Sequence, residues 1–109
     1  SFKLSNTIWE IIILWNSFAK DTIGKQFVRA ADSISANIAE GFARHSKKEK
    51  VHFYRIAKGS VSECLDWNQK SKVRKLITDD EYNLIFSELK EFPRLLNTLI
   101  KYTNEKLKQ

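Results

Sequence analysis

The chain has 109 residues, of which 42% are hydrophobic and 29% charged, and its formal net charge is +6. This length suits one domain, which we expect to span residues 1–109, and the composition excludes an intrinsically disordered chain. Three glycines and one proline are too few for the many turns of a β-sandwich or an α/β fold. The composition therefore favours a single all-α domain.

A first helix is predicted over residues 5–20, where apolar side chains recur at the helical period of 3.6 residues. Trp9, Ile13 and Leu14 lie off the core stripe, so this helix is apolar around most of its circumference. Residues 21–24, which end in Gly24, predict a turn. The predicted core stripe consists of Ile8, Ile11, Ile12, Trp15, Phe18 and Ala19.

A second helix is predicted over residues 25–43. Its core face includes Phe27, Ala31, Ile34, Ile38 and Phe42 at helical spacing. The opposite face is polar and comprises Gln26, Arg29, Ser33, Asn37, Glu40 and Arg44.

Third and fourth helices are predicted over residues 46–75 and 78–106, each opened by a capping box with Ser46 or Thr78 as the cap. Pro93 should kink the fourth helix, because it has no N–H and clashes with the preceding turn. Four amphipathic helices with short connections predict an up-down-up-down bundle. The apolar surface that a lone bundle does not need predicts a homo-oligomer. This excess consists of Trp9, Ile13, Leu14, Tyr54 and Leu65.

The segment from Arg29 to Glu63 follows the pattern R-A-x-x-S-I-x-x-N-I-A-E-G, then a polar S-K-K-E turn, then A-x-G-S-x-x-E. It resembles the bacterial four-helix-bundle proteins encoded in 23S rRNA intervening sequences, often called ribosomal-protein-like. The chain departs from the family at Ser35, where proline is usual, and at Lys58, where an apolar residue is common. The matching residues are Arg29, Ala30, Ser33, Ile34, Asn37 to Gly41, Ser46 to Glu49, Ala57, Gly59, Ser60 and Glu63.

This resemblance implies a four-helix protomer that assembles into a ring-shaped homopentamer. The chain is also distantly similar to the accessory proteins of diversity-generating retroelements. That similarity implies a basic pentameric barrel that binds nucleic acid and a reverse transcriptase.

The polar face of the second helix predicts a structural role. We expect Asn37 and Glu40 to form a polar network with Ser60 and Glu63, within or between subunits, because buried polar groups must be paired. The alternatives are a solvated face and a catalytic site, and a lone polar stripe is seldom catalytic.

No enzyme, metal or cofactor is predicted, because the sequence has no phosphate-binding glycine loop and no H-E-x-x-H or G-x-S-x-G motif. His45, Glu49 and His52 are one or two helical turns apart, but His45 falls in a turn, so three converging ligands are not expected. Cys64, the single cysteine, excludes an internal disulfide and is typical of a cytoplasmic protein with a buried, unreactive thiol. The apolar run at residues 8–15 is too short to cross a bilayer, so no membrane partner is predicted.

The basic residues predict an anionic partner such as RNA or DNA. In an up-down bundle, the turn between the second and third helices should lie near both termini, so cations would gather at one end and bind phosphates of structured RNA such as ribosomal RNA. No aromatic residue is expected among them, which predicts little sequence preference. The alternatives are a solvated charged rim and a protein-interaction scaffold or adaptor for a nucleic-acid enzyme such as a reverse transcriptase. The predicted nucleic-acid-binding residues are Arg44, Lys47, Lys48, Lys50, Lys101, Lys106 and Lys108.

Overall fold

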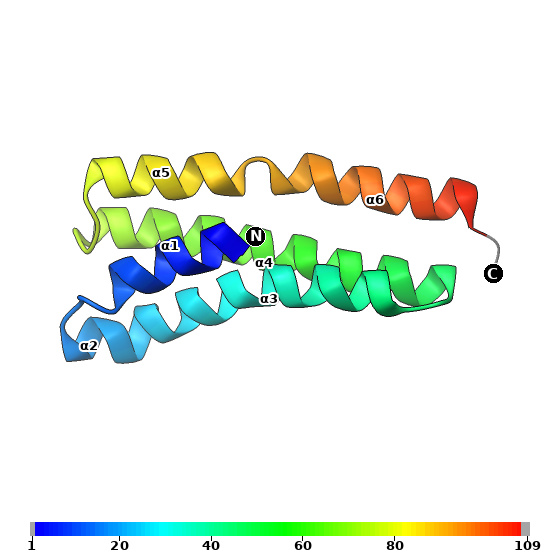
Figure 1. The fold of residues 1–109 in the computed structure, drawn as a ribbon. Coiled ribbons are helices and arrows are strands. Elements are labelled where there is room, and N and C mark those ends of the chain that lie inside the picture. Colours follow the sequence, from blue (N-terminus) through cyan, green and yellow to red (C-terminus); the bar gives the residue numbers. More distant parts are fainter. Residues whose placement is uncertain (1, 108–109) are drawn as a thin grey trace.

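A computed structural model describes residues 2–107, with side chains from residue 3 onward, and this part of the chain forms helices and turns but no strand. The helices make four rods that alternate in direction, so the predicted up-down-up-down bundle is confirmed (Figure 1). α1 is the first rod; α2, the π-helical turn η1 and α3 form the second; α4 is the third, and α5 with α6 the fourth. Their bounds are Phe2–Ile12 for α1, Ser17–Ala19 for α2, Lys20–Gly24 for η1, Lys25–Ala43 for α3, Lys47–Val73 for α4, Asp79–Leu89 for α5 and Phe92–Lys106 for α6.

The bundle has two unlike ends, 49 Å being its longest dimension. The turn from α3 to α4 and the C-terminal part of α6 lie at one end, which we call the α3–α4 end (Figure 1). The turns from α1 to α2 and from α4 to α5 lie at the other, which we call the α1–α2 end. α3 packs along α4, and this pair supports the other two rods.

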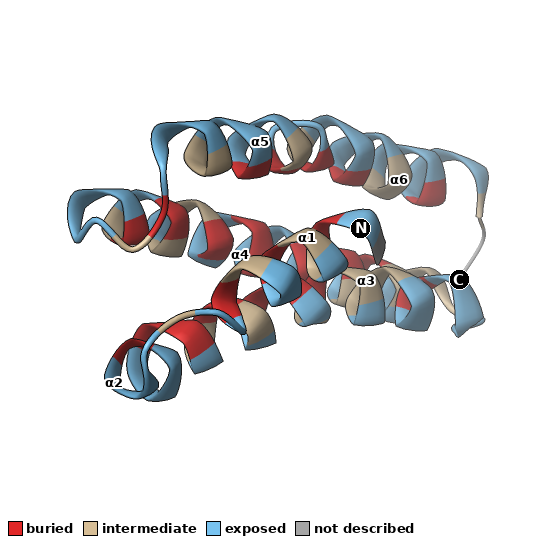
Figure 2. Ribbon diagram, turned by 60° about the vertical axis from the view of Figure 1, so that its left-hand side comes forward, coloured by how far each residue is buried: buried red, intermediate tan, exposed pale blue. Residues whose placement is uncertain are grey.

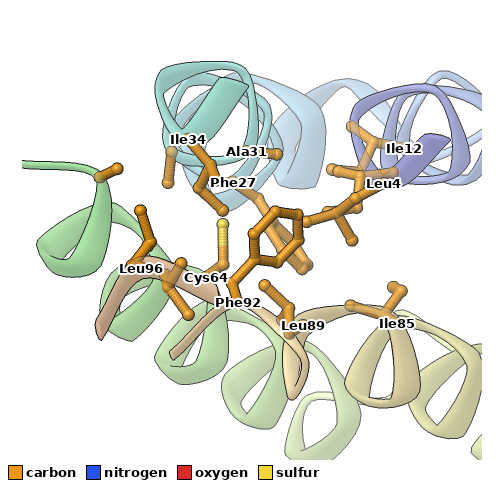
Figure 3. Close-up of a cluster of buried hydrophobic side chains, with 14 of the residues drawn as sticks. Leu4, Ile12, Phe27, Ala31, Ile34, Cys64, Ile85, Leu89, Phe92 and Leu96 are labelled. Atoms are coloured by element: carbon orange, nitrogen blue, oxygen red, sulfur yellow. The ribbon is translucent and has the colours of Figure 1, made fainter. Parts of the chain in front are cut away.

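The core lies on the inward faces of the rods, where buried residues line each helix (Figure 2). Ile34 of α3, Cys64 of α4 and Leu96 of α6 are fully buried. Figure 3 shows these side chains meeting others from α1 and α5, so all four rods contribute to one core.

The first predicted helix is wrong in its C-terminal half. α1 ends at Ile12, and Asn16 begins the next helix by accepting the N–H of Ala19 on its side chain at 2.9 Å. Asparagine is a strong N-cap, and this cap outweighs the apolar period that continues through residue 19. The predicted turn at residues 21–24 is instead η1, continuous with α3. Gly24 serves close packing, since a Cβ there would lie 2.8 Å from Ile12 Cγ2.

The described part of α1 is much shorter than α4. α1 has 11 residues and α4 has 27, which correspond to about 17 Å and about 40 Å of helix. α1 therefore covers only part of the bundle, and its first residues lie near the middle rather than at the α3–α4 end (Figure 1). Both chain ends are expected to flank the α3–α4 turn, and among the described residues the end of α6 lies there but the start of α1 does not (Figure 1).

The fourth rod breaks where the sequence predicts a kink. Thr78 and Glu81 form the full capping box that opens α5, with N–H to oxygen distances of 3.0 and 2.9 Å. α5 ends at Leu89, and α6 begins at Phe92 with Pro93 in its first turn, where the missing N–H costs nothing. The proline therefore restarts a helix rather than bending a continuous one.

Three aromatic residues differ from their predicted environments. Phe18 and Phe42 were expected in the core but are 80% and 61% exposed. Tyr54 was expected to lie outside the core, yet only 2% of it is exposed. Gly41 explains why Tyr54 is buried, because the tyrosine ring occupies the space that a Cβ on residue 41 would fill.

Apolar side chains remain exposed at the α1–α2 end. Leu14 is 85% exposed, and Ile13, Phe18 and Val73 are also open to solvent. A hollow of about 400 Å³, lined in part by Trp9 and Ile13, lies where α1 crosses η1 and the start of α3. The protomer alone does not cover this surface.

Candidate nucleic-acid interface

The basic residues of the α3–α4 end begin at the start of α4. Ser46 is the N-cap: its hydroxyl accepts the N–H of Glu49 at 3.1 Å and donates to the Glu49 carboxylate at 3.0 Å. This cap starts α4 at Lys47, so three lysines occupy its first turn. Cations oppose the helix dipole at an N-terminus, where acidic residues are favoured. The charges of these lysines therefore do not stabilise α4.

Lys50 has partners within the protein. Its Nζ donates to the carbonyl oxygens of Gly41 and Phe42, both at 3.1 Å. These carbonyls belong to the last turn of α3, which lacks intrahelical donors, and a cation there also complements the helix dipole. Lys50 thus closes α3 and offers less charge to a ligand than its sequence position suggests.

Arg44 is also engaged. Its Nη2 lies 2.7 Å from Glu40 Oε2, and its Nη1 lies 4.0 Å from Glu49 Oε2. The guanidinium carbon is 5.0 Å from the ring centroid of Phe53. Two carboxylates and one ring therefore share this cation.

Lys47 and Lys48 line a different surface. Together with His52 and Arg55 they surround a hollow of about 330 Å³ between the start of α4 and the end of α6. Val51 forms its apolar wall and Asn104 of α6 lines its other side, whereas no carboxylate of the described residues lines it. We call this the cationic hollow.

The predicted nucleic-acid-binding residues do not include His52, Arg55 and Asn104, which also line the cationic hollow. The signal for the first two was the spacing of residues 48, 52 and 55, which places three side chains on one face of a helix. The expectation that no aromatic residue lies among the cations is wrong, because the rings of His52 and Phe53 lie beside the lysines. Asn104 had no signal, since only the packing of α6 against α4 brings it there.

The remaining predicted cations are on or beyond α6. Lys101 and Lys106 are exposed on α6, and neither lines the cationic hollow. Lys108 lies outside the described residues.

The predicted polar network divides into two parts. The Ser33 hydroxyl oxygen accepts from Ser60 Oγ at 2.8 Å and from Asn37 Nδ2 at 2.9 Å, so these residues join α3 to α4. Glu40 bonds Arg44 on its own helix, and Glu63 is exposed with no hydrogen bond or ion pair to any described residue. A contact of these two glutamates with another subunit stays a prediction.

Other chemical groups are sparse. Within residues 2–107, no three His, Cys, Asp or Glu side chains gather as metal ligands. Burial, reinforced by the charges of Glu63 and Asp32, raises the pKa of the Cys64 thiol to about 12. The thiol is therefore protonated near neutral pH and is a poor nucleophile. Over the same residues, no helix has the length and apolar character to cross a membrane.

The fold and this site define a four-helix bundle with a cationic hollow at one end. Residues 1–98 match the family model described as 23S rRNA-intervening sequence protein. The chain belongs to this family, which confirms the resemblance carried by residues 29–63.

A solved structure has the same fold. It is a protein of unknown function from the S23 ribosomal protein family of Bacteroides thetaiotaomicron, with a TM-score of 0.71 and 23% sequence identity. The similarity covers 92% of this chain and 100% of that one. No curated protein matches the chain significantly.

Proposed function

We propose that this protein is a non-enzymatic RNA-binding protein of the cytoplasm. The observation that carries the proposal is the cationic hollow, where Lys47, Lys48 and Arg55 meet and no carboxylate from residues 3–107 lines the space. The two lysines oppose the dipole of their own helix, so a phosphate there would relieve an unfavourable arrangement. Structured ribosomal RNA is the proposed ligand, and the family description, which refers to 23S rRNA intervening sequences, is compatible with it.

The same proposal includes a ring-shaped homo-oligomer of five subunits. Its support is the apolar surface of the α1–α2 end, where Leu14 and Phe18 are the most exposed apolar side chains. A ring would repeat the cationic hollow in each subunit, and several weak phosphate contacts would add up to useful affinity.

Light scattering tests the assembly. The wild-type chain should have about five times the protomer mass, whereas L14D/F18D should reduce it to the monomer. Leu84→Asp, a comparable change at an exposed position of α5, serves as the control. A wild-type monomer at micromolar concentration would overturn the proposed ring.

RNA binding is tested by filter-binding salt titrations on ribosomal RNA fragments. K48E/R55E should abolish binding with helix content and oligomer mass unchanged. K75E/K90E, with the same change of charge at exposed positions away from the cationic hollow, should bind within a few-fold of the wild type. Affinity of the wild type should fall steeply as salt rises, because phosphate binding releases counterions.

An adaptor for a nucleic-acid enzyme, such as a reverse transcriptase, is the second candidate. The exposed apolar side chains of the α1–α2 end favour it, since they could pack against another protein. Equal RNA affinities for the wild type and K48E/R55E would remove the hollow from the RNA proposal and favour the adaptor.

A further inference from the structure

A second hollow adjoins the cationic hollow. It has a volume of about 380 Å³ and is lined by Arg44, Glu49 and Phe53, together with Lys48 and His52. Lys48 and His52 also line the cationic hollow, so these two side chains form a ridge between the pair. We call the second space the aromatic hollow.

The two hollows offer different chemistry. Within the part of the chain that the structure describes, the cationic hollow has cations and an amide but no carboxylate, which suits a phosphate group. In the aromatic hollow, the Glu49 carboxylate would repel a phosphate but can accept a hydrogen bond from a base N–H. The rings of His52 and Phe53, with centroids 5.3 Å apart, and the guanidinium over Phe53 supply flat surfaces on which a base can stack.

We infer that the pair of hollows binds one nucleotide of an unpaired RNA strand, with a phosphate in the cationic hollow and its base in the aromatic hollow. A paired base cannot reach such a surface, because its faces are stacked inside the helix and its edge is hydrogen-bonded. The inference rests on the proposed RNA-binding function and narrows it from charge-driven binding of structured RNA to recognition of the unpaired segments within it.

The test compares a short fluorescein-labelled single-stranded RNA with a blunt duplex of the same sequence, by anisotropy over a range of salt. The wild type should bind the single strand about tenfold more tightly, because stacking of one base contributes about that factor. His52→Ala, at an exposed position, should remove most of this preference without changing the salt slope. Phe53→Leu should act in the same way, and helix content monitors its folding.

Lys48→Met supplies the matched phosphate variant. On the single strand, it should reduce the magnitude of the negative slope of log affinity against log salt by about 0.7, which corresponds to the loss of one phosphate contact. Equal binding of single strand and duplex, or unchanged preference in both His52→Ala and Phe53→Leu, would overturn the inference. If either of these results were found but Lys48→Met still weakened RNA binding, the proposed function would stand without the further inference. Absence of binding to either RNA would overturn both.

Discussion

The α3–α4 end and the α1–α2 end of the bundle both expose cations and apolar side chains, but in different arrangements. The first presents lysine and arginine around two hollows, whereas the second presents Leu14 and Phe18. Both ends contain a glycine at a close helix contact, Gly41 beneath Tyr54 and Gly24 beside Ile12. Tight packing is therefore common to both ends, and the exposed surface is what distinguishes them.

The cations of the α3–α4 end also differ among themselves. Lys50 and Arg44 have carbonyl or carboxylate partners within the protein, whereas Lys47 and Lys48 face the cationic hollow. Lysines close together in the sequence thus have different roles: Lys50 caps the C-terminal end of α3, whereas Lys47 and Lys48 are available to a ligand. Net charge alone overstates how many cations a ligand can use.

The largest effect is expected at the tight contact of the α3–α4 end. Gly41→Ala places a methyl group in the space of the buried Tyr54 ring, and such overpacking typically costs about 1–3 kcal/mol of unfolding free energy. Urea denaturation measures it. Gly59→Ala is the matched control: open space surrounds that position, so alanine should stabilise α4 by up to about 1 kcal/mol. Equal stability of the two variants would show that Tyr54 does not depend on Gly41.

The next effect separates the two kinds of lysine. Lys50→Met should lower the unfolding free energy by about 0.5–1 kcal/mol, because the last carbonyls of α3 lose a charged donor. Lys47→Met should leave stability unchanged or slightly higher and should weaken RNA binding more than Lys50→Met does. Thermal denaturation and filter binding on both variants check this pair. The reverse pattern would contradict the division of roles.

A smaller loss is expected at the α1–α2 end. Gly24→Ala brings a Cβ within 2.8 Å of one methyl group of Ile12 and 3.3 Å of the Ala19 carbonyl oxygen. Alanine also favours a helix over glycine by about 1 kcal/mol, which offsets part of the clash. We expect a net loss below about 1 kcal/mol in urea denaturation. A loss larger than that of Gly41→Ala would reverse the ranking of the two contacts.

The smallest effect is expected at Glu40. Its ion pair with Arg44 is half-exposed and spans one turn of helix, and such pairs contribute about 0.3–0.5 kcal/mol. Glu40→Ala should therefore barely change the melting temperature of the protomer. Ser33→Ala, which removes the acceptor shared by Asn37 and Ser60, should cost about 1 kcal/mol. A large effect of Glu40→Ala, together with a loss of oligomer mass, would place Glu40 between subunits.

The sequence predicts the helices well where local signals agree. The predicted bounds of the second helix coincide with α3, and the caps at Ser46 and Thr78 start α4 and α5 as expected. The predicted first helix extends too far because the apolar period continues past Asn16, whose side chain caps the start of a new helix. In that case a single side-chain hydrogen bond decided the boundary.

The candidate site could be predicted only in part. The order of residues in the sequence predicts that basic side chains gather at the α3–α4 turn. It does not show that Lys50 has partners, because these lie eight and nine residues earlier on another helix. Tyr54 likewise depends on a missing side chain at Gly41 across the helix pair. Such tertiary contacts leave no periodic signal, so which cations remain available to a ligand emerges only once α3 and α4 are packed together.

The π-helical turn η1 has a consequence for insertions and deletions during evolution. A π-helix closes its hydrogen bonds over five residues instead of four, so η1 holds one residue more than a regular turn would. Deletion of one residue within Lys20–Gly24 would restore a regular α-helix and leave the segments on either side in nearly the same relative orientation, because the wider turn already accommodates the extra residue. Phe18 and Leu14 would then keep nearly the same direction relative to the α3–α4 pair. A one-residue deletion at this turn is therefore compatible with an unchanged α1–α2 end, whereas the same deletion within α3 would rotate that end by about 100° about the helix axis.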